Sequence, residues 1–143
     1  ATDIVKNAQT FASALAAEGF DVLAESRGYT ASHQVLTRHG DTDSGAGAKA
    51  AHLLEEAGII TNMNMLPGDT KAMTPSGLRL GVQELTRVGM GPLEMQEVAR
   101  LYARVLLHGE DTDSVRKHVA QLKSQFQTIR YCFNDENRTG YPL

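Results

Sequence analysis

The sequence predicts an α+β fold, in which a short, mainly antiparallel sheet packs against about four helices. Three observations support this prediction. Apolar residues recur with the 3.6-residue period of an amphipathic helix in four segments. Shorter runs between the first three segments show the alternation of strands. Glycine or proline marks most element ends. A chain of 143 residues is long enough for one domain with its own core.

The first half of the chain combines two helices with a hairpin. Thr2 or Asp3 can cap the opening helix, and Gly19 ends it in the left-handed conformation that glycine favours. Alternating residues predict two strands, and a glycine-centred turn between them predicts a hairpin. In order, these elements are a helix over 2–18, strands over 20–24 and 33–37, a helix from 44 or 46 to 57, and a short extended segment over 59–61.

The second half is predicted to begin with a long irregular stretch. It contains a strong turn signal from Pro67 to Asp69, and loops of this length are usually functional or mobile. Its methionines, Met63, Met65 and Met73, can pack against a ligand or another chain, or onto the domain's own core. In order, the elements are this loop over 62–76, a strand over 78–82, a turn or short helix to 89, a helix from 92 to about 107, a helix from 111–113 to about 126, and a last extended piece over 128–133.

Composition limits the classes of function. A single domain is predicted over residues 1–133, with a polar tail over 134–143 that we expect to fray or to dock elsewhere. The net charge of -3 and the mixed charges exclude the clustered basic face of a nucleic-acid-binding protein. No apolar run reaches the ~20 residues of a membrane span. The single cysteine, Cys132, fits a reducing compartment, so a cytoplasmic location is expected.

The sequence contains no pattern of a self-sufficient active site. Neither a phosphate-binding glycine loop nor a nucleophile elbow is present, and no carboxylate pair indicates acid–base chemistry. No catalytic residue is therefore predicted. A metal site is not expected, because the lone cysteine has no cysteine partner and no two histidines show metal-binding spacing. The histidines are His33, His39, His52, His108 and His118.

Arg79 is the best candidate for contact with a small molecule. It occupies the strand position that faces away from Leu78 and Leu80. A buried guanidinium needs an anionic partner, and its planar fork suits two-point contact with a carboxylate. The structural alternative is a surface arginine on an edge strand, or an internal salt bridge, and structural ion pairs are commoner than ligand clamps. As a residue that contacts a small molecule, Arg79 would be a binding residue and not a catalyst.

Five short motifs follow one another along nearly the whole chain. They are Val5-Lys6-Asn7-Ala8, Glu18-Gly19-Phe20, Ile60-Thr61-Asn62-Met63-Asn64, Ser76-Gly77-Leu78-Arg79-Leu80-Gly81 and Thr86-Arg87-Val88-Gly89-Met90. In this order and spacing they resemble the C-terminal domain of serine hydroxymethyltransferase. The run from Leu80 to Arg87 is similar to that of a related group, the threonine transaldolases.

The resemblance implies the small C-terminal domain of a fold-type-I pyridoxal-phosphate enzyme. In that family a lysine of a separate large domain forms a Schiff base with the cofactor, pyridoxal 5'-phosphate. The family's arginine in this strand grips the substrate's α-carboxylate, and by position this residue is Arg79. Asn64 matches a residue that contacts the folate cosubstrate, and His33 stands for the histidine of a family hairpin. The substrate-binding residues implied are therefore Arg79, Asn64 and His33.

Two departures from the family pattern qualify this picture. The large domain's T-T-T-x-H-K motif is absent, so the chain is not expected to bind the cofactor or to be catalytic alone. It would be a separately encoded half, a proteolytic remnant or a cloned fragment, acting with a cofactor-binding large domain or subunit in cis or trans, as a homo- or hetero-oligomer. The loop over 69–74 is one residue shorter than the family's and lacks its phenylalanine. This change argues against folate and for an aldehyde acceptor.

The predicted function is therefore the carboxylate-binding domain or subunit of a hydroxymethyltransferase-like aldolase or transaldolase. Its substrate would be a β-hydroxy amino acid, threonine or serine, and its acceptor an aldehyde. One alternative is a fragment of a folate-dependent serine/glycine hydroxymethyltransferase. Another is a non-catalytic binding or regulatory module that retains the fold. The sequence does not identify the donor amino acid or the acceptor aldehyde. It also leaves open whether folate is used and how many subunits the protein has.

Overall fold

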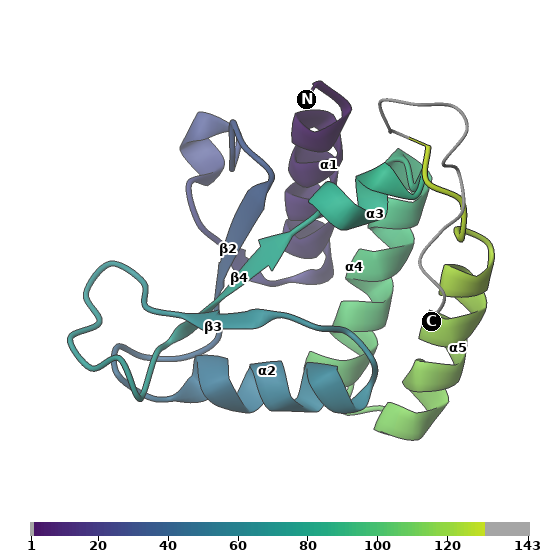
Figure 1. Cartoon of the computed structure of the whole chain (residues 1–143). Coiled ribbons are helices and arrows are strands. Elements are labelled where there is room, and N and C mark those ends of the chain that lie inside the picture. The colour runs from purple at the N-terminus through teal and green to yellow at the C-terminus, as the bar shows by residue number, and fades with distance from the viewer. Residues whose placement is uncertain (1, 131–143) are drawn as a thin grey trace.

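The computed structural model describes residues 2–130 and contains one four-stranded sheet (Figure 1). The strands are β1 (Asp21–Val22), β2 (Gln34–Arg38), β3 (Asn62–Asn64) and β4 (Gly77–Gly81). Their spatial order is β1-β2-β4-β3, and every neighbouring pair is antiparallel. Strand β4 is therefore an interior strand, hydrogen-bonded to β2 on one side and to β3 on the other.

Helices pack on the sheet in a second layer. They are α1 (Thr2–Glu18), α2 (Ala46–Glu56), α3 (Gln83–Arg87), α4 (Pro92–Leu106) and α5 (Thr112–Ser124), with a 3-10 turn η1 (Glu25–Arg27). Helices α1 and α4 pack against one another, α2 packs against β3, β4 and α4, and α5 lies on the outer side of α4 (Figure 1). The predicted α+β class with a short antiparallel sheet is confirmed. The additional helix, α3, forms where a turn or short helix was predicted.

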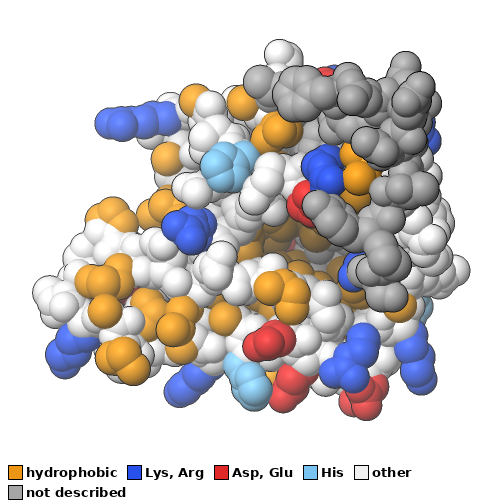
Figure 2. Space-filling view, viewed as in Figure 1, with side chains coloured by type: hydrophobic (Ala, Val, Ile, Leu, Met, Phe, Trp, Pro, Cys, Tyr) orange, Lys and Arg blue, Asp and Glu red, His pale blue; other side chains and the backbone are white. Residues whose placement is uncertain are grey.

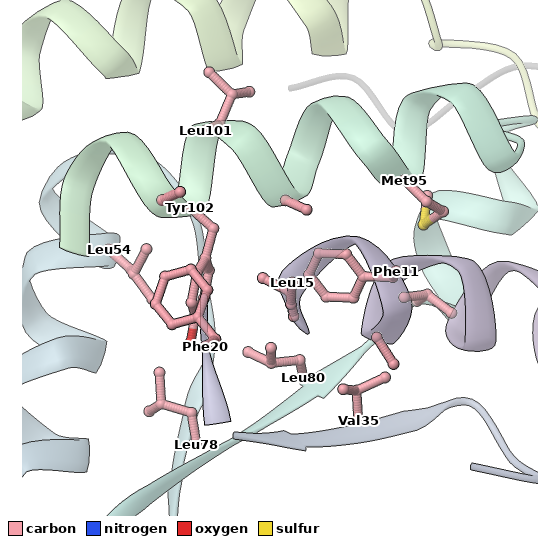
Figure 3. Packing of buried hydrophobic residues seen from close by; sticks show 14 of the residues in the cluster. Phe11, Leu15, Phe20, Val35, Leu54, Leu78, Leu80, Met95, Leu101 and Tyr102 are labelled. Carbon is pink, nitrogen blue, oxygen red and sulfur yellow. The ribbon is translucent and has the colours of Figure 1, made fainter. Parts of the chain in front are cut away.

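The core lies between the sheet and the helices. Val35, Leu78 and Leu80 point from the strands toward Phe11 of α1 and Tyr102 of α4 (Figure 3). Alternation along β4 explains this arrangement, because every second side chain of a strand points to the same face. The residues that the structure describes are enough to bury the centre of this core. Leu15, Leu54, Leu78, Met95 and Tyr102 are all fully buried.

Polar groups fix the ends of the helices. Asp111 caps α5, because its carboxylate accepts a hydrogen bond from the Ser114 N–H at 2.9 Å. Glu94 accepts one from the Gly91 N–H at 2.7 Å at the start of α4. The amide of buried Asn7 donates to Met90 O at 2.9 Å and to Thr86 Oγ1 at 3.0 Å, which fastens α1 to the segment after β4.

The structure corrects two strand predictions. The extended segment predicted over 59–61 is not a strand, and the third strand instead occupies 62–64, which was predicted as loop. Three residues are too few to show a two-residue period, and pairing with β4 creates this strand. The predicted strand over 20–24 is shortened to β1, because Ala24 adopts a left-handed conformation with φ 65° and begins η1.

The other end of the chain is only partly described. Thr128 forms an isolated bridge, and the Arg130 N–H donates to Arg87 O at 2.8 Å. Residues 131–133 of the predicted extended piece and the predicted tail over 134–143 lie outside the described residues, so the domain boundary at 133 stays a prediction. Within residues 2–130, no helix has the length and apolar character needed to cross a membrane.

Candidate functional site

Arg79 lies in the middle of β4, with its side chain on the face opposite the core. Its neighbours Leu78 and Leu80 are 0% and 4% exposed, whereas Arg79 itself is exposed. The predicted alternation is therefore confirmed. The alternative of an edge strand is wrong, because β2 and β3 pair with β4 on both sides at this residue: Leu36 and Asn62 are the partners of Arg79.

A cavity of about 210 Å³ surrounds the exposed side of Arg79. Its lining residues are His33, Gln34, Ile60, Thr61, Asn62, Arg79, Gly81 and Gln83. This lining, which we call the Arg79 pocket, contains one arginine, one histidine, three carboxamides and no carboxylate. The pocket therefore has positive charge and hydrogen-bonding groups, which is the composition expected for binding a small anion.

The Arg79 guanidinium has no hydrogen bond or ion pair with any other residue in the range 2–130. The predicted alternative of an internal salt bridge is thus not found in the described part of the chain. The Thr61 hydroxyl of the same pocket is buried and also has no hydrogen-bond partner there. Buried polar groups are rarely left unpaired, so the Thr61 hydroxyl indicates that the pocket is completed by something else. The Arg79 guanidinium is exposed, so its donors are open to solvent or to a ligand.

The structure brings together two of the three predicted site residues. His33 is half-buried and lines the pocket with Arg79, and its carbonyl accepts a hydrogen bond from the Val82 N–H at 3.2 Å. Asn64 does not line the pocket. It pairs with Gly77 at the other end of β4, and its Nδ2 donates to Met65 O at 2.6 Å.

Sequence reasoning missed the carboxamides of the pocket. Asn62 lies directly opposite Arg79 in the antiparallel ladder. Gln83 folds back over Gly81, where a Cβ atom would lie only 2.6 Å from Gln83 Oε1. The N-x-N spacing offered a signal for Asn62, because residues two apart in a strand share a face. No sequence signal pointed to Gln83, whose placement depends on the missing side chain of Gly81.

Two aspartates join the loops that precede α2 and β4. The Asp69 carboxylate accepts hydrogen bonds from the N–H groups of Asp43, Leu66 and Ser76, at 2.8–2.9 Å. In return Asp43 accepts from Thr70 N–H and Oγ1, at 2.8 and 2.7 Å. These hydrogen bonds hold the pKa of each carboxyl below its ordinary value. This reciprocal pair, the Asp43–Asp69 brace, fixes the backbone that leads into β4.

Exposed hydrophobic side chains lie beside this region. Met63 is 52%, Met65 40% and Met73 83% exposed, so these methionines do not pack onto the core. Ile60 of the pocket lining is 78% exposed. Figure 2 shows hydrophobic side chains gathered at the lower left of this view, around β3 and the 65–76 loop. Of the two predicted alternatives, packing against a ligand or another chain is the one the structure leaves open.

The described residues do not fit a covalently bound pyridoxal phosphate. That cofactor needs a lysine amine inside a cavity. All five lysines of the chain are exposed, and none lines the Arg79 pocket: they are Lys6, Lys49, Lys71, Lys117 and Lys123. Between residues 2 and 130, no group of three or more His, Cys, Asp or Glu side chains is arranged to hold a metal ion.

Comparison with known proteins identifies the family. The family model described as serine hydroxymethyltransferase matches residues 1–102. The chain belongs to the serine hydroxymethyltransferase family. This family assignment confirms the resemblance predicted from the short motifs.

Individual relatives agree with this assignment. Serine hydroxymethyltransferase from Thermococcus kodakarensis is 52% identical over 145 residues, covering 100% of this chain and 33% of the relative. The one from Pyrococcus abyssi is 52% identical over 136 residues, covering 94% of this chain and 32% of the relative. Among solved structures, L-threonine transaldolase from Pseudomonas fluorescens matches with a TM-score of 0.77 and 31% identity, over 87% of this chain and 28% of that chain.

The chain thus spans about one third of the length of the curated serine hydroxymethyltransferases it matches. The likeness to the transaldolase structure covers most of the described fold and confirms the predicted architecture of a small C-terminal domain of this enzyme class.

Proposed function

We propose that this chain is the part of a serine hydroxymethyltransferase-family enzyme that binds the carboxylate of an amino-acid substrate, and that Arg79 is the residue that binds it. The observation that carries the proposal is the unpaired guanidinium on an interior strand, in a pocket without carboxylates. Hydrogen bonds to β2 and β3 hold the backbone at Arg79. From this backbone position, the guanidinium fork can donate two hydrogen bonds to one carboxylate.

Two-point contact would give the chain a role in orientation. A carboxylate held through both oxygens fixes the position of the adjacent α-carbon, and correct orientation of a reacting bond contributes orders of magnitude to a rate. Pyridoxal phosphate, when bound by the part of the protein outside this chain, supplies the electron sink for bond cleavage at that carbon. His33 would form a wall of the same pocket. Asn64 lies outside the pocket lining, and the resemblance implies that it would contact a second substrate, the folate.

For the acceptor, two candidates have specific support. Identity of 52% to serine hydroxymethyltransferases supports transfer of a one-carbon unit to folate. The shortened loop over 69–74 and the structural likeness to L-threonine transaldolase support an aldehyde acceptor. The full-length protein, supplied either with serine and tetrahydrofolate or with threonine and an aldehyde, would separate them by which pair of substrates is consumed. A protein that consumes neither pair would support the non-catalytic alternative.

Arg79→Ala in the full-length protein is expected to raise the KM for the amino acid by at least about tenfold and to lower kcat. Loss of a charge-assisted contact justifies this magnitude. Arg79→Lys should recover only part of the loss, because an ammonium group cannot reproduce the planar fork. Steady-state kinetics with varied amino acid would measure both.

Arg100→Ala is the matched control for this experiment. Arg100 is an exposed arginine of α4 that pairs only with Glu97 within the described residues, at 2.5 Å. Its removal should leave KM and kcat unchanged. Equal kinetics for Arg79→Ala and Arg100→Ala would refute the proposed role of Arg79.

A further inference from the structure

The residues around Arg79 carry amide groups where acidic groups of nearly the same shape would fit. Asn62 is the direct cross-strand partner of Arg79. Paired residues in an antiparallel ladder have Cβ atoms about 4.5–5.5 Å apart, within reach of a short side chain and a guanidinium. An aspartate at position 62 would therefore pair with Arg79 across the strands.

Gln83 reaches the same space from the other direction. Gly81 and Arg79 are two residues apart on β4, so they share the face that bears the pocket. The Gln83 carboxamide occupies the space over Gly81, where it would touch a Cβ atom from both its oxygen and its nitrogen, at 2.6 and 3.2 Å. Gln83 and Arg79 thus line the same pocket on one face of β4, and a glutamate at position 83 would bring a carboxylate into that pocket.

The charge of these side chains decides whether Arg79 is available. A guanidinium with a neighbouring carboxylate is already paired, and an incoming anion must displace that partner. A guanidinium with neighbouring amides keeps its donors free, and the amides can also hydrogen-bond a bound ligand. The pocket lining within residues 2–130 follows this pattern, because it includes carboxamides at 34, 62 and 83 and no acidic residue.

We propose that Asn62 and Gln83 are specificity-determining residues of the Arg79 pocket: as uncharged amides they leave the guanidinium free for a ligand carboxylate, and so select small anionic ligands. This inference rests on the proposed function of Arg79. It extends that function to two residues to which the family motifs assign no role. Acidic residues at these positions would convert the pocket into one without free positive charge.

The first test places a carboxyl group at each position and titrates it. In the 143-residue chain, the carboxyl introduced by Gln83→Glu or Asn62→Asp should show a pKa at least about one unit below its ordinary value, measured by carbon-detected NMR. Adding Arg79→Ala should return that pKa to its ordinary value. Gln121→Glu, on the exposed side of α5 and outside the pocket lining, is the charge-matched control and should titrate normally. Normal titration in both pocket variants would overturn the inference.

The second test uses sodium acetate as the probe, followed by the NMR signal of the Arg79 side chain. Gln83→Glu and Asn62→Asp should each weaken acetate binding at least tenfold, whereas Gln121→Glu should leave it unchanged. If acetate shifts the Arg79 signal equally in the unsubstituted chain and in the two pocket variants, the inference fails and the function of Arg79 stands. If acetate leaves the Arg79 signal of the unsubstituted chain unshifted, the proposed function of Arg79 fails, and the titration still decides whether the amides neighbour the guanidinium.

Discussion

The His39 side chain is partly buried among hydrogen-bonding and aromatic groups. Its Nε2 lies 2.9 Å from Thr37 Oγ1 and 3.0 Å from the Tyr102 hydroxyl, and the Phe20 ring lies 5.9 Å away between centroids. Burial lowers the pKa of His39 from 6.5 to about 4, although the nearby Asp21 opposes this shift. The folded chain therefore keeps this imidazole neutral at ordinary pH.

This shift predicts how stability depends on pH. Between pH 6.5 and about 4 the unfolded chain binds a proton at His39 that the folded chain does not. Stability contributed by neutral His39 is therefore complete above pH 6.5 and is lost as pH falls toward 4. His39→Gln should flatten the fall in unfolding free energy between pH 7 and pH 5, measured by urea denaturation. The same substitution at exposed His108 is the control, and a slope unaffected by His39→Gln would contradict the assignment.

For single residues, the sequence predicted which face of the sheet a side chain lies on, but not which residues surround it. Alternation predicted correctly that Arg79 faces away from Leu78 and Leu80. It did not predict that Asn62 would lie opposite Arg79, since pairing depends on which strands become neighbours. The roles assigned to His33 and Asn64 came from family motifs, and the structure separates the two: one lines the Arg79 pocket and the other does not.

Among the elements, β4 is preceded by a loop whose backbone is held by hydrogen bonds to side chains. The Asp43–Asp69 brace ties the 66–76 loop to the loop before α2, and Ser76 Oγ donates to the Asp69 carboxylate at 2.9 Å. A close backbone approach reinforces it, because a Cβ atom on Gly47 would lie 2.3 Å from Gly77 O. The first residue of β4 is thereby held from both loops.

Asp69→Asn is expected to destabilise the chain at pH 7, because an amide offers one acceptor oxygen where several N–H groups now converge, and its NH₂ group faces those donors. The pKa of Asp69 is lowered below 3.8, so the stability from its carboxylate is present above that pH and disappears as pH falls through the lowered value. The loss caused by Asp69→Asn should therefore shrink in acid. Thermal unfolding at pH 7 and pH 3 would measure this difference.

Asp41→Asn provides the comparison for that experiment. Asp41 is an exposed residue of the loop before α2, and its carboxylate makes no hydrogen bond or ion pair with any residue in the range 2–130. Its carbonyl accepts a hydrogen bond from the Ser44 N–H at 3.1 Å. Its substitution should change stability little at either pH. Equal losses of stability for the two substitutions would mean that the hydrogen bonds of the Asp43–Asp69 brace do not stabilise the chain, and that only the removal of a negative charge matters.

The elements themselves differed in how far they could be predicted. Helices α1, α2, α4 and α5 carry sustained apolar periodicity and end signals, and each was predicted within a few residues of its position. Strand β3 was missed because its three residues form a strand only through tertiary pairing with β4. Short edge strands carry too little local information to be distinguished from loop.

For the molecule as a whole, the methionines divide into two classes. Met63, Met65 and Met73 are exposed, whereas Met90 and Met95 are 4% and 0% exposed. Dilute hydrogen peroxide should therefore oxidise the first three rapidly and the last two slowly, because oxidation of methionine depends on access to the sulfur. Peptide mass mapping over time would measure the rates. Equal rates at Met73 and Met95 would contradict the described packing, and a denatured sample, in which all five react alike, is the control.

Because side chains alternate along β4, its two faces differ in what a substitution would change. Leu78 and Leu80 on one face belong to the core, whereas Arg79 on the other face is exposed and lines the pocket. Substitutions around Arg79 on the outer face should therefore cost less folding stability than substitutions at Leu78 or Leu80. Under the proposed function, such substitutions would change which ligand binds while the core stays the same.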